Sequence, residues 1–481
     1  MRGHAFGPSQ PIVTEGLRPV SSETVAHEQG RSRSRRRELA SWFGVPAVGA
    51  LWAAYRLRRT YFFYDEWSMI DRVMHLPTWT GMTRSFNGHL WVFQGLLYRI
   101  QVAWFGVDSH LFVCVIFLLS LIALHVTVAM VFKGGGVPWF MSLVAAGLLT
   151  YLGAASQNFV FAVQTSPNLA LAVGLSAAVV AVTRQPTTVG FALAGTMMVL
   201  SVAFDSAAAL TSISFSAVVL LIAWRGRYSL AVLPSLVAMG WWYLTGDLGP
   251  VDDGSLAIKA RFAVHLFLRS IGSLFAQGEL AGGVILALVA ATVSVGLAKG
   301  AVVGNTRAVL AAGMFSTVVT TAAIAHSRAV TVGVNFVDYN RYLQNVLIPF
   351  ALAALPAVYA TLRGLRWAGH STRYAPLRGM AGPVIVGLAF LLGLSPLRAY
   401  NRSFEAWNVA VRDGVRDATA VIAGGCPSGA PPAPLSQPLG DLSPQVSTRL
   451  LQELLERGAL TSSGGREVDQ TVVDRMCPDS P

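Results

Sequence analysis

Two adjacent carboxylates, Asp65 and Glu66, are the residues of this sequence best placed to do chemistry. They lie in the aromatic stretch Tyr61-Phe62-Phe63-Tyr64-Asp65-Glu66-Trp67, directly after the first apolar run of a largely apolar chain. Acids at a membrane boundary are costly to hold there, so they are functional candidates by default. A carboxylate can act as a general base on a hydroxyl, which typically contributes about 10²–10⁴-fold in rate. Asp65 is the preferred catalytic residue and Glu66 the second candidate, because neighbouring helical residues point in different directions and only one should face a site.

Three arginines, Arg56, Arg58 and Arg59, stand between the first apolar run and the two acids. An arginine side chain can hold a phosphate or pyrophosphate group through two parallel hydrogen bonds. Arg58 and Arg59 are therefore candidate substrate contacts for a phosphate leaving group. A structural alternative is that these arginines pair with Asp65 or extend to lipid head groups.

Three residues from distant parts of the chain could complete such a site. His89 follows an Asn-Gly turn, Asp205 occupies a very short turn between two apolar runs, and Arg341 lies just before a late apolar run. An acid between two apolar runs is a functional candidate, and Arg341 is a further candidate phosphate contact. The alternatives are a loop-stabilising hydrogen bond for His89, a solvated turn for Asp205 and an ion pair with Asp338 for Arg341.

Several common catalytic motifs are missing from the sequence. It contains no HExxH zinc motif, no phosphate-cradling P-loop and no GxSxG elbow, so zinc hydrolysis, ATP-driven transport and serine hydrolysis have no motif here. Carboxylate oxygens suit Mg²⁺ and Mn²⁺. Either ion could therefore be a cofactor with Asp65 as a metal ligand, and no other cofactor is expected.

The composition predicts an all-α polytopic membrane protein. Of the 481 residues, 53% are hydrophobic and 12% are charged, whereas a soluble domain carries roughly 25% charged residues. Only helices and closed barrels can span lipid, and the apolar runs here are continuous rather than alternating. We expect about eleven transmembrane helices, at about 39–55, 111–132, 138–152, 169–182, 189–203, 209–224, 230–244, 280–297, 308–325, 346–362 and 382–396.

The distribution of cations predicts the topology. With the N-terminus in the cytoplasm, the short loops on the inside hold most of the arginines and lysines, as the positive-inside bias requires. This bias also explains the net charge of +12, so no nucleic-acid partner is expected. Three regions follow: a disordered basic cytoplasmic tail (1–38), a transmembrane domain (39–398) whose first extracytoplasmic loop is 61–109, and a small extracytoplasmic C-terminal segment (399–481). Within the first loop, the spacing of apolar residues from Leu90 to Phe105 favours an interfacial helix.

Two of the three cysteines belong to the C-terminal segment. Cys426 and Cys477 would lie outside the cytoplasm in this topology, where a disulfide between them can persist. Cys114 lies inside an apolar run and is expected to behave as a small hydrophobic residue.

The topology and a few short segments resemble the GT-C superfamily of polyprenyl-phosphate-sugar glycosyltransferases. The resemblance is carried by a long first outside loop that opens with Asp65-Glu66, by interfacial helices in that loop, by Asn87-Gly88-His89, and by Asp338-Tyr339-Asn340-Arg341-Tyr342 before a late span. It implies that Asp65 is the catalytic base or a metal ligand. It also implies a mannosyl- or arabinosyltransferase-like enzyme in a bacterial plasma membrane. The C-terminal segment is short compared with the outer domains of arabinosyltransferases, so the acceptor class does not carry over.

The predicted function is therefore the transfer of a sugar from a polyprenyl-phosphate donor to a hydroxyl of a glycan, lipid or protein acceptor at the outer face of the membrane. A transporter or flippase of a lipid-linked glycan is the alternative from another class. Such proteins often show inverted repeats with broken helices, and no convincing pair of repeats is visible in the sequence. A non-enzymatic membrane scaffold would leave the two acids unexplained.

Overall fold

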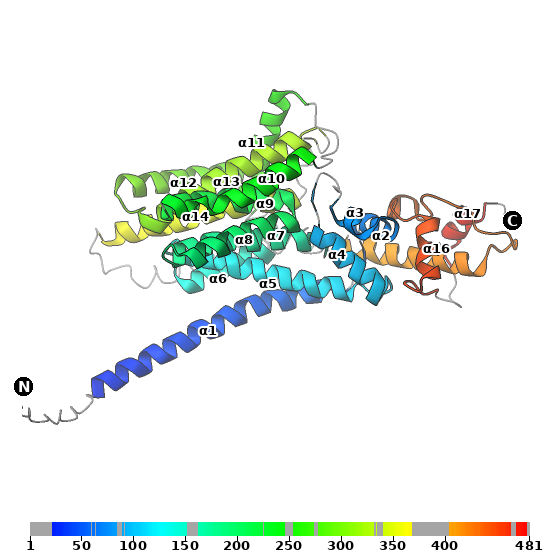
Figure 1. Ribbon diagram of the computed structural model, residues 1–481, viewed down its shortest axis with the longest axis horizontal. Helices are drawn as coiled ribbons and strands as arrows, with labels where there is room; N and C mark the ends of the chain where they lie inside the picture. Colours follow the sequence, from blue (N-terminus) through cyan, green and yellow to red (C-terminus); the bar gives the residue numbers. More distant parts are fainter. Residues whose placement is uncertain are drawn as a thin grey trace, which may run out of the picture.

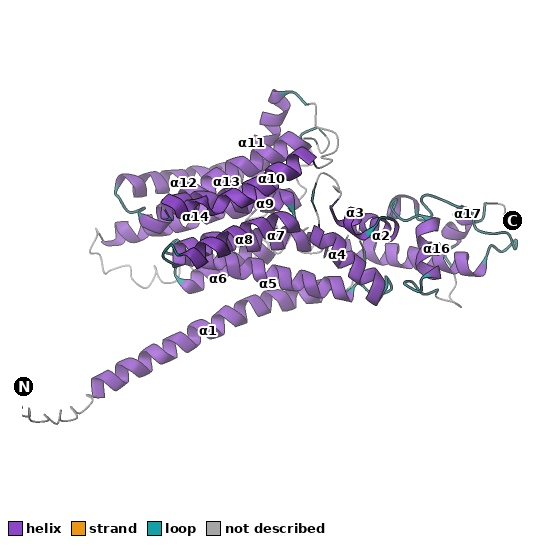
Figure 2. Cartoon of the chain, viewed as in Figure 1, coloured by secondary structure: helices purple, strands orange, loops and turns teal. Residues whose placement is uncertain are grey.

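The structure is a computed structural model in which the described residues form helices and no β-strand (Figure 2). It describes residues 22–58, 60–62, 64–83, 89–90, 92–151, 162–224, 226–245, 254–273, 278–330, 333, 340–367, 404–462 and 468–478. The N-terminal helix α1 spans Ser22–Leu57, so the structure extends this helix into the tail that was predicted to be disordered. Figure 1 shows the N-terminal part of α1 running away from the other helices.

The first loop folds into short helices. They are α2 (Tyr64–His75), α3 (Thr78–Thr83), α4 (Val92–Ile100) and the π-helical turn η1 (Gln101–Phe105). The apolar pattern that predicted one interfacial helix at Leu90–Phe105 thus corresponds to α4 and η1. Leu97 and Tyr98 are buried, whereas Trp104 is 78% exposed. The buried side of this segment packs into protein, and its exposed aromatic end suits a membrane–water interface.

The bundle consists of the helices that follow. They are α5 (Leu111–Gly134), α6 (Trp139–Tyr151), α7 (Thr165–Thr183), α8 (Thr188–Phe204), α9 (Ser206–Ala223), α10 (Leu233–Thr245), α11 (Leu256–Gly272), α12 (Glu279–Ala298), α13 (Gly304–Arg328) and α14 (Asn340–Trp367), with 3₁₀ turns η3 (Ala162–Gln164) and η4 (Gly226–Val232). Beyond the bundle come a helix over residues 404–424, the turn η8 (Gly440–Leu442), α16 (Thr448–Glu456) and α17 (Gln470–Met476).

Six helices in the described part of the chain are long and apolar enough to cross a membrane: Leu111–Gly134, Ala162–Thr183, Ser206–Ala223, Glu279–Ala298, Gly304–Arg328 and Tyr342–Leu365. The prediction of a helical protein with several membrane spans is confirmed at this level. The other predicted spans correspond to part of α1, to the shorter helices α6, α8 and α10, and to 382–396, which lies outside the described residues. The number eleven therefore stays a prediction.

Small residues allow the bundle helices to approach closely. A Cβ on Gly174 of α7 would lie 2.0 Å from Ser212 Oγ of α9, and one on Gly313 of α13 would lie 2.5 Å from the Pro349 carbonyl oxygen of α14. A hydroxyl group also joins α13 to α9, since Ser316 of α13 donates to the Thr211 carbonyl of α9 at 2.7 Å. Close backbone approach and interhelical hydrogen bonds are the usual sources of helix association in membranes, where hydrophobic burial contributes little.

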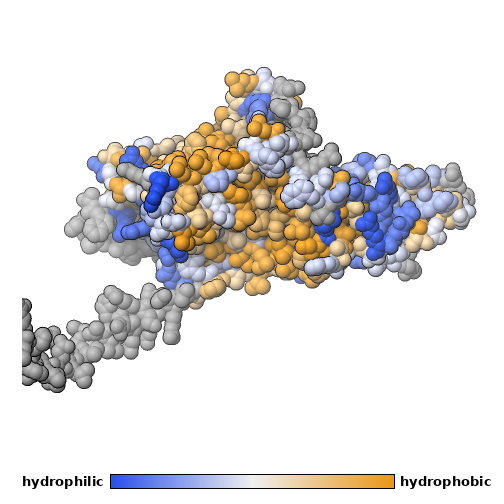
Figure 3. Space-filling model, in the orientation of Figure 1, coloured by the Kyte–Doolittle hydropathy of each residue, from blue (hydrophilic) through white to orange (hydrophobic). Residues whose placement is uncertain are grey.

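The chain builds a second hydrophobic core, which also includes side chains of α1 and of the first half of α5, such as Ala53 and Phe117. It combines residues of the first loop with buried residues of the C-terminal segment, such as Val411, Leu450 and Met476. We call residues 60–110 and 404–478 together the cap, and Figure 1 shows the cap at one end of the bundle. Figure 3 shows hydrophobic residues over the middle of the molecule and many hydrophilic residues over the cap. The C-terminal segment is thus a structural partner of the first loop.

Candidate active site

The two adjacent acids occupy the first turn of α2 but have different surroundings. Glu66 is fully buried, whereas Asp65 is half-buried. The buried face of α2 continues through Trp67 and Ile70 into the core of the cap. A helix N-terminus favours a negative charge through the partial positive charge of its free N–H groups. The carboxylate of Asp65 is therefore favoured electrostatically while part of its surface remains accessible.

Glu66 is the centre of a buried hydrogen-bonded network. The Tyr98 hydroxyl donates to its carboxylate from α4, and His110 Nε2 lies 3.1 Å from Glu66 Oε1, just before α5. The Phe62 ring covers His110, with ring centroids 4.5 Å apart. Burial disfavours the imidazolium, but Cys114 and Glu66 outweigh this effect and raise the pKa of His110 to about 10. Burial, with the nearby Glu66, also raises the pKa of Tyr98 well above its usual value.

Cys114 extends the network in an order known from nucleophilic catalysis. Its Sγ lies 3.5 Å from His110 Nδ1, and His110 in turn contacts Glu66. A nucleophile, a base and an orienting carboxylate follow one another in this way in many enzymes. Here, however, Cys114 is 7%, His110 6% and Glu66 0% exposed. With so little surface for a substrate, the network acts as a structural clamp that fixes α2 against α4 and α5.

The segment before α2 is held from the other half of the cap. The backbone N–H of Tyr61 donates to Asn408 Oδ1 at 2.9 Å, and the Tyr61 hydroxyl donates to the Val107 carbonyl at 2.9 Å. Arg56 pairs with Glu405 at 3.1 Å. These contacts fix the start of α2, and with it Asp65. Asn408 and Glu405 lie hundreds of positions later in the chain, whereas Val107 belongs to the first loop itself.

The predicted arginine contacts have different outcomes. Arg58 is exposed, and its guanidinium lies over the ring of Tyr55 of α1, 4.0 Å from the ring centroid. Arg59 lies outside the described residues, as does the side chain of Arg341, whose backbone belongs to the first turn of α14. Their expected role as phosphate contacts therefore stays a prediction.

The structure brings two of the predicted site residues, His89 and Asp205, together. His89 Nδ1 lies 3.4 Å from Asp205 Oδ2 in the turn between α8 and α9. Asp205 is buried and caps α9 by accepting from the backbone N–H of Ala208 at 2.6 Å. Next to this pair, the backbone N–H of Leu90 donates to Ser206 Oγ at 3.1 Å. The end of the first loop is therefore anchored on the bundle.

Further polar side chains line the contact between α4 and the bundle. Ser166 of α7 donates to Gln94 Oε1 at 2.7 Å. Within the bundle, Asn168 Nδ2 of α7, two residues after Ser166, lies 3.5 Å from Ser120 Oγ of α5. All four side chains are buried. We call this contact region, with the His89–Asp205 pair, the junction, and it is where the polar cap meets the apolar bundle.

A disulfide joins the two halves of the C-terminal segment. Cys426, after the helix over 404–424, pairs with Cys477, after α17, with their Cα atoms 5.7 Å apart. Both cysteines belong to the core of the cap. This is the pairing that their shared segment suggested.

Among the described residues, no three His, Cys, Asp or Glu side chains form a group that could hold a metal ion. The expected Mg²⁺ or Mn²⁺ therefore stays a prediction with Asp65 as its candidate ligand. Sequence reasoning did not identify His110, Tyr98 or Cys114 as partners of the acid pair. The available signal was the i, i+4 spacing of His110 and Cys114 at the start of an apolar run, which places both on one helix face.

The chain was compared with protein-family models, curated proteins and solved structures, and none of the three comparisons gives a match. The fold, the acid pair of α2 and the polar contacts of the junction are therefore the basis for a function.

Proposed function

We propose that the chain is a glycosyltransferase that moves a sugar from a polyprenyl-phosphate carrier to an acceptor hydroxyl of a glycan, lipid or protein. The reaction would take place at the outer face of a bacterial plasma membrane, with the N-terminus cytoplasmic and the C-terminus outside. One observation carries the proposal: a half-buried acid, Asp65, stands in the first turn of a helix locked in place by its neighbour Glu66. That helix belongs to a polar cap on an apolar bundle. This arrangement suits a reaction between a lipid-borne donor and a polar acceptor.

The proposed chemistry is a direct displacement at the anomeric carbon. Asp65 accepts the proton of the acceptor hydroxyl while the hydroxyl oxygen forms the new bond to that carbon. The bond from the carbon to the phosphate oxygen breaks, and the polyprenyl phosphate leaves with the electron pair. The configuration of the sugar is inverted. Arg58, Arg59 or Arg341 would hold the departing phosphate.

The rest of the cap has a positioning role in this proposal. The network around Glu66 fixes the orientation of α2, and the His89–Asp205 contact fixes the end of the first loop against the bundle. A divalent ion would take the carboxylate of Asp65 as an oxygen ligand.

The proposal is tested with purified protein in proteoliposomes that contain a labelled polyprenyl-phosphate sugar and an acceptor. We expect Asp65→Asn to lower turnover by about 10²–10⁴-fold, the usual contribution of a general base. Asp474→Asn is the matched control, because Asp474 lies in α17 of the cap, where its contact is with Gln470 at 2.7 Å. The control should keep near-normal turnover.

Near-normal turnover of folded Asp65→Asn would exclude Asp65 as the base. A different result would favour the transport alternative: flux of a lipid-linked glycan across sealed vesicles without formation of a glycosidic bond. The same vesicle preparation can measure both quantities.

A further inference from the structure

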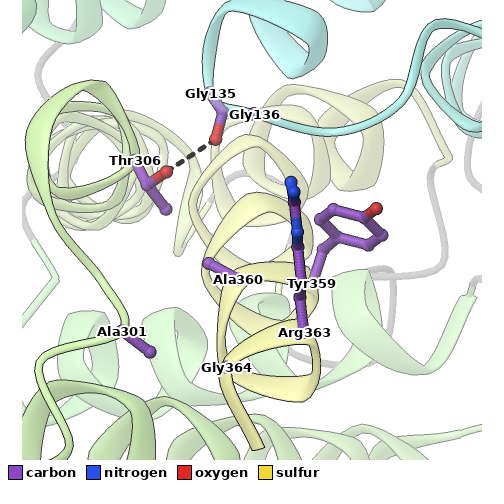
Figure 4. Close-up of a pocket in the computed structure, with 8 residues that line it drawn as sticks. All are labelled: Gly135, Gly136, Ala301, Thr306, Tyr359, Ala360, Arg363 and Gly364. Carbon is purple, nitrogen blue, oxygen red and sulfur yellow. Dashed lines mark hydrogen bonds between the residues drawn. The ribbon is translucent and has the colours of Figure 1, made fainter. Parts of the chain in front are cut away.

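A pocket lies at the end of the bundle opposite the cap. Its volume is about 300 Å³, at the lower end of the range for small-molecule sites. It is formed where α5 ends, α13 begins and α14 ends, and Figure 4 shows its lining: Gly135, Gly136, Ala301, Thr306, Tyr359, Ala360, Arg363 and Gly364. The junction and the cap contribute no residue to this pocket, so it is a separate site.

Cations predominate around the pocket. The described charged side chains at this end of the bundle comprise one acid, Glu38, and a set of cations: Lys133, Arg184, Arg227, Lys299, Arg307 and Arg363. Glu38 is paired with Lys133. Of the cations, Arg363 lines the pocket itself. The surroundings therefore favour an anionic ligand.

Arg363 and Tyr359 form the polar wall of the pocket. They are four residues apart on α14, which places them on the same helix face. Figure 4 shows the two side chains next to each other, both extending from α14 in the direction of the loop with Gly135. The planar guanidinium of an arginine matches the geometry of a phosphate, and a tyrosine hydroxyl can add a further donor.

The opposite wall is the N-terminal end of α13, a helix of 25 residues. Its N-cap residue, Val303, provides no side-chain hydrogen bond to the first turn. Thr306 of that turn lines the pocket, and its hydroxyl donates to the Gly135 carbonyl at 2.8 Å. Free N–H groups of a first turn, together with the helix dipole, attract anions such as phosphate.

Glycines keep the pocket walls close together. A Cβ on Gly364 would lie 3.0 Å from the Ala301 Cβ, and one on Gly135 would lie 3.0 Å from Pro356. Gly136 has a backbone φ angle of +96°, which residues other than glycine rarely adopt. The turn after α5 can therefore pass close to the start of α13 and leave a compact, electropositive space.

We propose that this pocket binds a phosphate group through Arg363, Tyr359 and the first turn of α13. The head group of an anionic phospholipid is the expected source, because the pocket lies at the cation-rich end of an apolar bundle and cytoplasmic leaflets are rich in anionic lipid. A soluble phosphate ester has the same chemistry and is the other source. The inference is independent of the reaction proposed for Asp65.

The test uses the full chain in nanodiscs of phosphatidylcholine with a small fraction of phosphatidylglycerol, and measures the lipids that stay bound by native mass spectrometry. We expect enrichment of phosphatidylglycerol around the wild-type protein. Arg363→Gln should lower its affinity about tenfold or more, as expected for the loss of a charge-assisted hydrogen bond. Arg184→Gln, which removes an exposed cation at the same end of the bundle, is the control and should change the affinity less than twofold.

A second variant separates the pocket from general charge. Ala360→Phe fills the cavity and leaves every cation in place, so it should also abolish the enrichment. Binding of inorganic phosphate to detergent-solubilised wild type, lost in Arg363→Gln, would support the phosphate site with a soluble source. Equal effects of Arg363→Gln and Arg184→Gln, or unchanged enrichment in Ala360→Phe, would overturn the proposal.

Discussion

The buried network around Glu66 predicts that this residue is a stability determinant of the cap. Its carboxylate accepts from Tyr98 and contacts His110, and all three side chains are buried. Removal of one partner of a buried charged pair typically costs about 3–5 kcal/mol, because the other charge stays behind uncompensated. We therefore expect Glu66→Ala to lower the free energy of unfolding by about 3–5 kcal/mol. Tyr98→Phe removes one hydrogen bond to a charged group and should cost about 1.5–3 kcal/mol.

The assay is denaturant titration of the detergent-solubilised protein, followed by tryptophan fluorescence. Trp67 of α2 is a suitable reporter because it is fully buried and its ring centroid lies 5.6 Å from that of Phe62. The control is Glu456→Gln, an exposed residue of the cap for which about 0.5 kcal/mol or less is expected. A double-mutant cycle of Glu66→Ala and Tyr98→Phe then measures the coupling of the two side chains.

Two results would refute this reasoning. One is a Glu66→Ala protein within about 1 kcal/mol of wild type, which is far below the expected cost of an unpaired buried charge. The other is additivity of the two substitutions within about 0.5 kcal/mol, since residues that share a hydrogen bond should be coupled.

Two further predictions concern the stability of the cap: one tests the disulfide within its C-terminal segment, and the other tests a contact between that segment and the first loop. Replacing Cys426 and Cys477 by serine should destabilise the cap by about 4 kcal/mol in the chain-entropy model, given their separation of 51 residues. Limited proteolysis with and without reductant measures the loss of stability. Equal cleavage rates with and without the disulfide would contradict the prediction. His75 of α2 lies 2.9 Å from Glu453 of α16, and its hydrogen bonds to Glu453 and to the Asp71 backbone raise its pKa. The contact therefore stabilises the cap fully below the unfolded-state pKa of about 6.5, and its contribution is lost as the pH rises through the higher folded-state pKa. For a pair this accessible, the loss in the free energy of unfolding is roughly 0.2–1 kcal/mol. Cap stability measured over a pH series should show this dependence in the wild type and not in His75→Gln.

The helical, membrane-spanning character of the bundle could be predicted from the sequence because it depends on local composition. Continuous apolar runs and short cationic loops predicted helices at the positions where α5, α7, α9, α12, α13 and α14 lie. The number of spans could not be derived in the same way. Helices such as α6, with 13 residues, are apolar but shorter than the roughly 20 residues that cross a bilayer alone, and their position depends on packing against neighbours.

The candidate site could be predicted only in part, for a related reason. The acid pair identified the first turn of α2, and helical geometry predicted that only one of the two acids would face a site. The partners of Glu66, in contrast, come from residues 32 and 44 positions later. His75 and Glu453 are 378 positions apart. Contacts of this range depend on how the whole chain packs. The local spacing of His110 and Cys114 places these two residues on one helix face but does not indicate Glu66 as their partner.

The composition of the cap also constrains how the protein can be made. Its core needs side chains from near the beginning of the chain and from its last part. During synthesis, the apolar residues of the first loop must therefore wait until the bundle has been inserted and the final segment has emerged. Over that interval they are open to chaperones, to proteases and to wrong partners. A chain that stops before the final segment would leave this surface exposed permanently, which offers quality control a way to recognise unfinished copies.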